Sequence, residues 1–122
     1  MEKVFLKEGK YIYCIIASNE VQSFGPLGIG GRGDELHTIL YDDIAAVVSD
    51  SPVISYSLSR ENMLTYERAI EEIMKKYTVL PVRFNTIAKD EDKVKKILEI
   101  EHDRFAELLK NMEGKKELGL KA

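Results

Sequence analysis

The sequence predicts an α+β domain in which two amphipathic helices cover one face of a mixed, mainly antiparallel sheet. Two observations lead to this fold class: short strand patterns dominate the first half of the chain, and two helical patterns separated by an extended segment fill the second half. The expected order of elements is β-β-β-α-β-α-β. A chain of 122 residues, with 44% apolar and 32% charged side chains, is long enough for one globular domain of this kind.

The strands are predicted from their residue types. Residues 11–17 (Tyr-Ile-Tyr-Cys-Ile-Ile-Ala) are mostly β-branched or aromatic, which indicates a strand buried on both faces. Residues 19–35 are polar and rich in glycine, which indicates a long loop. Residues 36–41 and 44–49 then form two short strand patterns, and the pair Asp42-Asp43 between them favours a tight turn. We therefore expect a hairpin there.

Two helices are predicted from apolar residues spaced three and four apart. Ser59 is the expected N-cap of a helix that runs to residue 77, and Pro81 makes residues 79–84 extended. A second helix is expected over residues 90–112, with Gly114 as its stop signal. The apolar stripe of the first helix comprises Met63, Tyr66, Ile70, Ile73 and Tyr77; that of the second comprises Val94, Ile97, Leu98, Phe105, Leu108, Leu109 and Met112.

The last residues predict a domain boundary. Residues 116–122 alternate polar and apolar side chains, which is typical of a strand that is just beginning. We therefore assign residues 1–114 to the N-terminal α+β domain. Residues 115–122 are the expected start of a strand that leads to a second, missing domain.

Composition argues against several function classes. The longest apolar runs are too short to span a bilayer. With 18 basic and 21 acidic side chains, a net charge of −3 and no basic tract, the chain offers nucleic acid little to bind. One cysteine, expected to be a small buried hydrophobe, fits a reducing cytoplasm. The single cysteine and two histidines lack the spacing of a metal site, and no nucleophile motif is present. We expect no enzyme activity, cofactor or metal.

Two features leave alternatives open. Gly28, Gly30 and Gly33 match the spacing of a dinucleotide-binding loop, which makes a small-ligand or nucleotide-binding regulatory domain the alternative function. That motif needs a strand before it and a helix after it, whereas a flexible connector is expected here. His102 interrupts the second apolar stripe, and is either a hydrogen-bonded boundary residue or a titrating switch.

The most informative segment is Val-Leu-Pro-Val-Arg-Phe-Asn-Thr at residues 79–86. Alternation places Leu80, Val82 and Phe84 on one face, with Arg83 opposite. Pro81 favours an edge strand, and edge strands recruit partners. Arg83 either pairs with an acid of the first helix, such as Glu67 or Glu71, or contacts a partner protein. The predicted protein-interaction residues are Tyr66, Glu67, Leu80, Pro81, Val82, Arg83, Phe84, Asn85 and Thr86.

These segments resemble the gas vesicle protein F/L family (GvpF/GvpL). The opening strand at residues 11–16 and Asp-Asp-Ile-Ala-Ala-Val-Val-Ser at residues 42–49 are similar to two of its signatures. The helix at residues 61–74, joined to residues 78–86, carries the most specific similarity. Two positions depart from the family pattern: Tyr66 replaces the usual histidine, which argues against a role for an imidazole there, and Asn85 replaces the usual glycine, which fits a backbone with positive φ.

The resemblance implies an accessory or minor structural protein for gas vesicle assembly. Family members have two domains, the second of them ferredoxin-like, and are not known as enzymes. They contact the small hydrophobic shell protein and other gas vesicle accessory proteins. The resemblance thus implies a non-enzymatic assembly factor in the cytoplasm and at the gas vesicle, which binds these partners and a second domain of its own chain.

Overall fold

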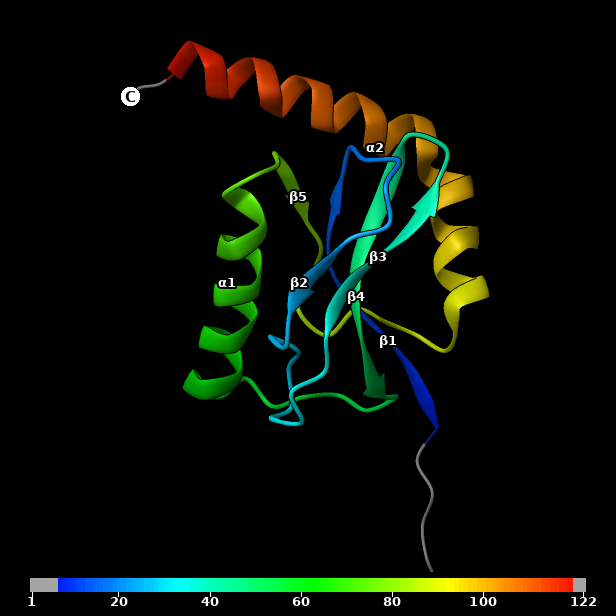
Figure 1. Cartoon of the computed structure of the whole chain (residues 1–122), viewed down its shortest axis with the longest axis vertical. Coiled ribbons are helices and arrows are strands. Elements are labelled where there is room, and N and C mark those ends of the chain that lie inside the picture. The colour runs from blue at the N-terminus through cyan, green and yellow to red at the C-terminus, as the bar shows by residue number, and fades with distance from the viewer. Residues whose placement is uncertain (1–6, 120–122) are drawn as a thin grey trace, which may run out of the picture.

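The computed structural model describes residues 7–119, with side chains through residue 113. It is an α+β fold, as predicted, with one curled sheet and two helices (Figure 1). The order is β-β-β-β-α-β-β-α, because two short strands that the sequence did not predict, β2 and β6, join the sheet. The elements are β1 (Glu8–Ile16), β2 (Ser23–Gly25), β3 (Leu36–Tyr41), β4 (Ile44–Pro52), α1 (Arg60–Met74), β5 (Val79–Pro81), β6 (Ile87–Ala88) and α2 (Glu91–Gly119).

The sheet is built around β1, the strand that was predicted to be buried on both faces. The strand order is β2-β3-β4-β1-β5, with β6 also paired to β1, and every pairing among the described strands is antiparallel. The predicted hairpin is confirmed: β3 and β4 pair up to the contact Tyr41↔Ile44, so Asp42 and Asp43 form a two-residue turn. Asp42 adopts φ 54, which an aspartate in a tight turn tolerates.

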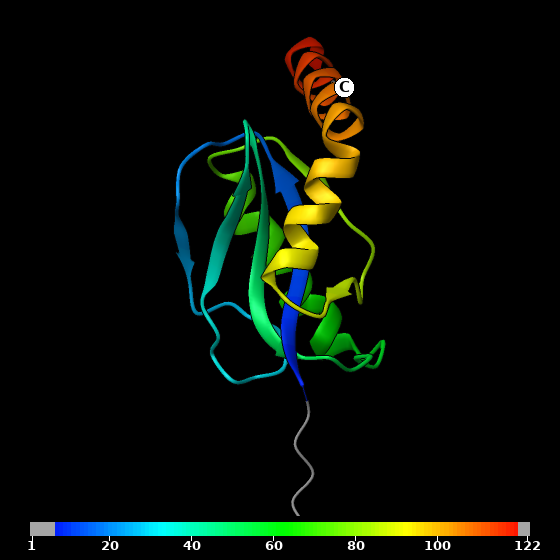
Figure 2. The same cartoon turned by 90° about the vertical axis from the view of Figure 1, so that its right-hand side faces the viewer.

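The two helices lie on opposite faces of the sheet, so the prediction that both cover one face was wrong. Figure 2 shows α2 in front of the sheet and α1 behind it. Tyr66, Ala69 and Ile73 of α1 pack against one set of strand residues, and Val94 and Leu98 of α2 pack against another. The physical reason was already visible in β1: a strand that is apolar on both sides needs a cover on each side.

A bulge in β1 helps to divide its side chains between the two faces. The register with β4 shifts between Ile12 and Cys14. Tyr11, Tyr13, Cys14 and Ile16 therefore belong to the core under α1, whereas Ile12 and Ile15 belong to the core under α2. A bulge places two successive side chains on one face, and here it directs both Tyr13 and Cys14 toward α1.

The helix starts agree with the sequence, but the helix ends do not. The Ser59 side chain accepts a hydrogen bond from the Asn62 N–H, which confirms the predicted N-cap of α1. That helix ends at Met74 rather than at residue 77. At the other end of the chain, α2 passes through Gly114 and continues to Gly119, so the strand predicted to begin at residue 116 is helical instead. Residues 120–122 lie outside the described residues, and the second domain stays a prediction.

The C-terminal half of α2 passes over the end of the sheet toward α1 (Figure 1). Its residues Phe105 and Leu109 are buried there, 7% and 4% exposed. Among residues 7–119, none of the helices is long and apolar enough to cross a membrane.

Candidate functional site

The segment after α1 contains most of the predicted interaction residues. Only residues 79–81 form a strand, β5, which is last in the strand order and thus confirms the predicted edge position. The chain then turns, so the predicted shared face of three apolar side chains is not formed. Leu80 and Val82 pack against the core under α2, whereas Phe84 packs against the core under α1.

Hydrogen bonds fix this segment to the rest of the domain. The Tyr66 hydroxyl of α1 donates to the Val82 carbonyl, and the Asn85 N–H donates to the Tyr11 hydroxyl, with 2.8 Å between these two atoms. The Thr86 hydroxyl donates to the Arg83 carbonyl at 2.6 Å. Tyr66 therefore anchors the segment from inside the domain. It is only 9% exposed, and its hydroxyl already bonds to the Val82 carbonyl.

Asn85 is the turning point of the segment. Its φ of 71 confirms the expectation of a positive φ at this position. Its side-chain oxygen accepts from the Tyr56 N–H and its side-chain amide donates to the Tyr56 carbonyl, both at 2.8 Å. One asparagine therefore replaces glycine conformationally and also ties the segment to the connector between β4 and α1.

Aromatic rings fill the space beneath the segment. Phe84 lies edge-on to Tyr66, with 5.5 Å between ring centroids, and edge-on to Tyr11 at 6.2 Å. Tyr13 stacks on Tyr66 at 6.2 Å, and its hydroxyl bonds to the Ser49 hydroxyl and accepts from the Ile29 N–H, each at 2.8 Å. Burial raises the pKa of Tyr13 to about 12, so this cluster stays neutral.

Three of the predicted residues remain exposed: Pro81, Arg83 and Glu67. Pro81 and Arg83 lie two positions apart on one segment, and we call these two the Arg83 surface. Within the described residues, Arg83 forms no ion pair, so the predicted pairing with Glu67 or Glu71 of α1 is not present. The structure therefore presents Arg83 as an exposed cation on a fixed segment.

Pro81 limits what the edge of the sheet can bind. The Val82 N–H donates to the Tyr13 carbonyl at 3.2 Å, so the backbone N–H of residue 82 faces β1. In an antiparallel ladder the backbone groups of the neighbouring residue face the opposite side of the strand, which here is the open edge of the sheet. That residue is Pro81, which has no N–H. An added strand would lack a donor at this position. Contacts with a partner are therefore favoured through side chains rather than through strand addition.

The glycine-rich loop lacks the geometry of a nucleotide site. Gly33 is followed by strand β3 rather than by a helix N-terminus. The Gly28 N–H donates to the Asp34 carbonyl at 2.9 Å, and Arg32 forms ion pairs with Glu8 and Asp34 at 2.9 and 2.8 Å. The Gly28 N–H and the loop's one arginine are thus used within the domain, and no helix N-terminus follows the glycines. The structure offers no support for the alternative function.

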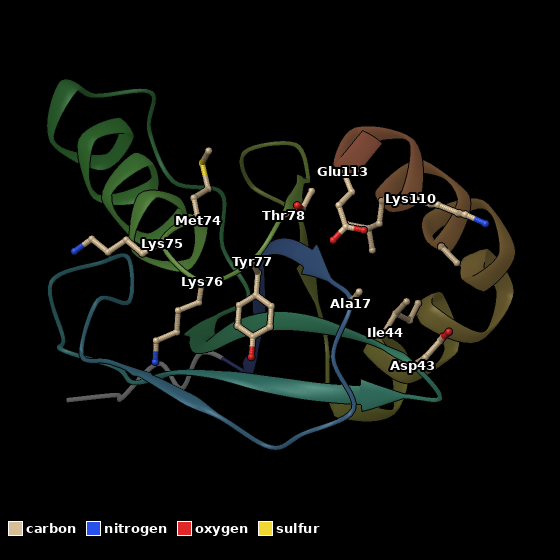
Figure 3. Close-up of a pocket in the computed structure, with 12 residues that line it drawn as sticks. Ala17, Asp43, Ile44, Met74, Lys75, Lys76, Tyr77, Thr78, Lys110 and Glu113 are labelled. Atoms are coloured by element: carbon tan, nitrogen blue, oxygen red, sulfur yellow. The ribbon is translucent and has the colours of Figure 1, made fainter. Parts of the chain in front are cut away.

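A groove of about 350 Å³ lies between the end of α1, the start of β4 and the C-terminal half of α2 (Figure 3). Met74 and Tyr77 line it from the α1 side, and Leu109 from α2. Lys75 and Lys110 point away from it in Figure 3, whereas the Glu113 carboxylate points toward it. The groove was not predicted, because its lining comes from four separate segments: Ala17, Asp43, Ile44, Met74, Lys75, Lys76, Tyr77, Thr78, Ala106, Leu109, Lys110 and Glu113.

The remaining chemistry-bearing residues are Cys14, His37 and His102, and His37 bonds through Nδ1 to the Glu35 carbonyl oxygen at 3.2 Å. Cys14 is fully buried, as predicted, and burial raises the pKa of its thiol to about 12. His102 is hydrogen-bonded to Asp43 and Asp103, in agreement with a bonded boundary residue. Ligand atoms of Asp42, Asp43 and His102 lie within 4.8 Å of one another. We assign no metal there, because the two carboxylates are exposed and already face the imidazole.

Comparisons with known proteins agree with these features. A family model described as gas vesicle synthesis protein GvpL/GvpF matches residues 9–122. Gas vesicle protein F of Streptomyces sp. (strain CB03234) is 29% identical over 115 residues, which are 92% of this chain and 47% of that protein. Gas vesicle protein F of Dolichospermum flosaquae is 28% identical over 114 residues, 91% of this chain and 46% of that protein. The chain thus spans about half the length of these curated relatives.

Solved structures share the fold. The crystal structure of gas vesicle protein GvpF from Anabaena sp. PCC7120 superposes with a TM-score of 0.68 at 22% identity, over 85% of this chain and 43% of that one. GvpF from Microcystis aeruginosa superposes with a TM-score of 0.67, over 84% of this chain and 43% of that one. Because the family model covers nearly every residue described above, this chain belongs to the gas vesicle synthesis protein GvpL/GvpF family.

Proposed function

We propose that this chain is a non-enzymatic accessory or minor structural protein for gas vesicle assembly, which acts by binding the gas vesicle shell protein and other gas vesicle proteins. Family membership and relatives named gas vesicle protein F support a role connected with gas vesicles. We place the protein in the cytoplasm and at the gas vesicle. A second domain of the same chain is part of this proposal, since the relatives are about twice as long.

The Arg83 surface is the contact that we propose. The observation that carries it is an exposed arginine without an ion pair in the described structure. It is held on a segment anchored by the side chains of Tyr11, Tyr66 and Asn85, the last of which bonds to the Tyr56 backbone. A fixed segment loses little conformational freedom when it binds, and an arginine offers several donors to a carboxylate. The proposed partner residue is therefore an acidic group next to an apolar surface that contacts Pro81.

The test is to measure the affinity of the 122-residue chain for the gas vesicle shell protein and for other gas vesicle proteins. Arg83→Glu should weaken binding by about tenfold or more, which corresponds to about 1.4 kcal/mol. The matched control is Arg104→Glu, which reverses the charge of another exposed arginine, on α2. Its ion pair with Glu101 is exposed, so the fold should tolerate the change.

Each outcome decides something. Loss of binding in Arg83→Glu but not in Arg104→Glu supports the proposed surface. Equal binding by the wild type and both variants would reject the Arg83 surface. A wild-type chain that binds none of the gas vesicle proteins would reject the binding function for this domain.

A further inference from the structure

His102 joins two elements that are far apart in the sequence. It lies on α2, where that helix passes the turn between β3 and β4. Its Nε2 atom is 2.7 Å from an Asp43 carboxylate oxygen and 3.5 Å from an Asp42 carboxylate oxygen. On the other side of the ring, Nδ1 is 3.0 Å from an Asp103 carboxylate oxygen. The imidazole thus lies between the turn and its own helix.

This geometry requires a protonated imidazole. A neutral imidazole carries only one N–H, and its second nitrogen has a lone pair. Here both ring nitrogens face carboxylate oxygens, so two donors are needed and only the imidazolium has them. A neutral ring would place a lone pair against Asp43 or Asp103, which is repulsive.

Among the described residues, the charged groups that face the His102 ring are all acidic. The turn contributes Asp42 and Asp43, α2 contributes Asp103, and β3 contributes the uncharged ring of Tyr41, 5.9 Å away edge-on. The nearest cation of α2 in sequence, Arg104, is paired with Glu101. The hydrogen bonds that the ring donates to Asp103 and to Asp43 accordingly raise the pKa of His102 above its usual range.

The histidine also lies beside the groove of Figure 3. Asp43 and Ile44, on the turn side, both line the groove. Ala106 follows His102 by four residues and so shares its helix face, and it lines the groove from α2. The distance between the turn and α2 therefore helps to set the width of the groove, and Met74 of α1 forms its opposite side.

We propose that His102 is a pH-dependent clasp, which in its protonated form holds the β3–β4 turn against α2 and keeps the groove narrow. The clasp is fully closed below the ordinary histidine pKa of about 6.5. It weakens as the pH rises through the raised pKa of the folded state, because the charge that attracts Asp42 and Asp43 is then lost. The inference goes beyond the proposed function and uses none of the Arg83 surface.

Proton NMR can test the clasp directly, because the chain has only two histidines, His37 and His102. A His37→Gln variant assigns the two ring signals. We expect His102 to titrate above the ordinary histidine value, and Asp43→Asn to lower the pKa of His102. A chelator in the buffer keeps divalent cations away from the carboxylates.

The link to the groove needs a reporter that does not contact the imidazole. The methyl signal of Met74, assigned with Met74→Leu, should shift with the same midpoint as the His102 ring. The shift should disappear in His102→Gln, whose uncharged amide keeps one hydrogen-bond donor but does not titrate. The thermal unfolding midpoint of the wild type should exceed that of His102→Gln at pH 6, and this advantage should shrink toward pH 9.

Two results would overturn the proposal. If His102 titrates at or below the ordinary histidine value, or if its pKa is unchanged in Asp43→Asn, it does not hold the turn against α2 in the proposed way. A Met74 methyl signal that does not shift with the pH midpoint of the His102 ring would show that the histidine does not affect the groove. Asp43→Asn keeps the test decisive if His102→Gln proves too unstable to study.

Discussion

The two faces of the sheet are stabilised by different physics. Under α1 lie five tyrosines and two phenylalanines, and each tyrosine hydroxyl is hydrogen-bonded to a backbone or side-chain partner. Under α2 lie mainly aliphatic side chains, which offer no hydrogen-bonding groups; Phe105 and Tyr41 are the aromatic members of this core. The α1 face therefore specifies positions through hydrogen bonds, whereas the α2 face contributes mainly buried apolar area. The Leu80–Thr86 segment is anchored mostly to the first kind of face.

The largest expected effect is on the aliphatic face. Leu98 is a residue of α2 whose side chain is fully buried against the sheet. Leu98→Ala should therefore lower the free energy of unfolding by about 2–5 kcal/mol, through lost burial and a cavity. Urea unfolding followed by circular dichroism measures this. The control is Ile100→Ala on the same helix, where the side chain is 69% exposed and the effect should be small. Equal losses in both variants would contradict a core centred on Leu98.

The second prediction removes a single oxygen from the tyrosine face. Tyr13→Phe leaves the buried Ile29 N–H and Ser49 hydroxyl without their partner, which should cost about 1–3 kcal/mol. Tyr41→Phe is the matched control, because the Tyr41 hydroxyl has no hydrogen bond within residues 7–113, and the change should be nearly neutral. If Tyr13→Phe is equally neutral, the hydroxyl hydrogen bonds under α1 do not contribute to stability, and the two faces do not differ in this respect.

The third prediction concerns backbone conformation on the tyrosine face. Asn85→Gly and Asn85→Ala both remove the bonds to Tyr56, but only alanine must also adopt φ 71 with a Cβ atom. Asn85→Ala should therefore be less stable than Asn85→Gly by about 1–2 kcal/mol. Comparing the two urea midpoints isolates the conformational cost. Equal midpoints would mean that the turn relaxes to another conformation.

The smallest expected effect is common to both faces. Ser59 caps α1 and the Asp90 carboxylate accepts from the Lys93 N–H at the start of α2, at 2.8 Å. Ser59→Ala and Asp90→Ala should each cost about 1 kcal/mol, because capping depends on the helix end and not on the core beneath it. Thermal unfolding of both variants checks this. A markedly larger loss in either one would show that its cap also anchors the neighbouring loop.

Parts of the candidate site could be predicted from single residues. Pro81 indicated the edge position, and the asparagine at residue 85 indicated positive φ, because both residues restrict or permit backbone angles locally. The orientation of Leu80, Val82 and Phe84 could not be predicted by alternation, because the chain leaves the strand at Pro81. The pairing of Asn85 with Tyr56, 29 residues earlier, has no local signal at all.

By itself the sequence determined the class of the fold, the β3–β4 hairpin, the start of α1 and the burial of β1, because each depends on residue types within a few positions of one another. Only the tertiary structure decided on which face each helix packs, where α2 ends, and that His102 meets Asp43 across 59 positions of sequence. The physical reason is that these features depend on which surfaces meet once the chain has folded. Local periodicity shows that a surface is apolar, but not which other surface covers it.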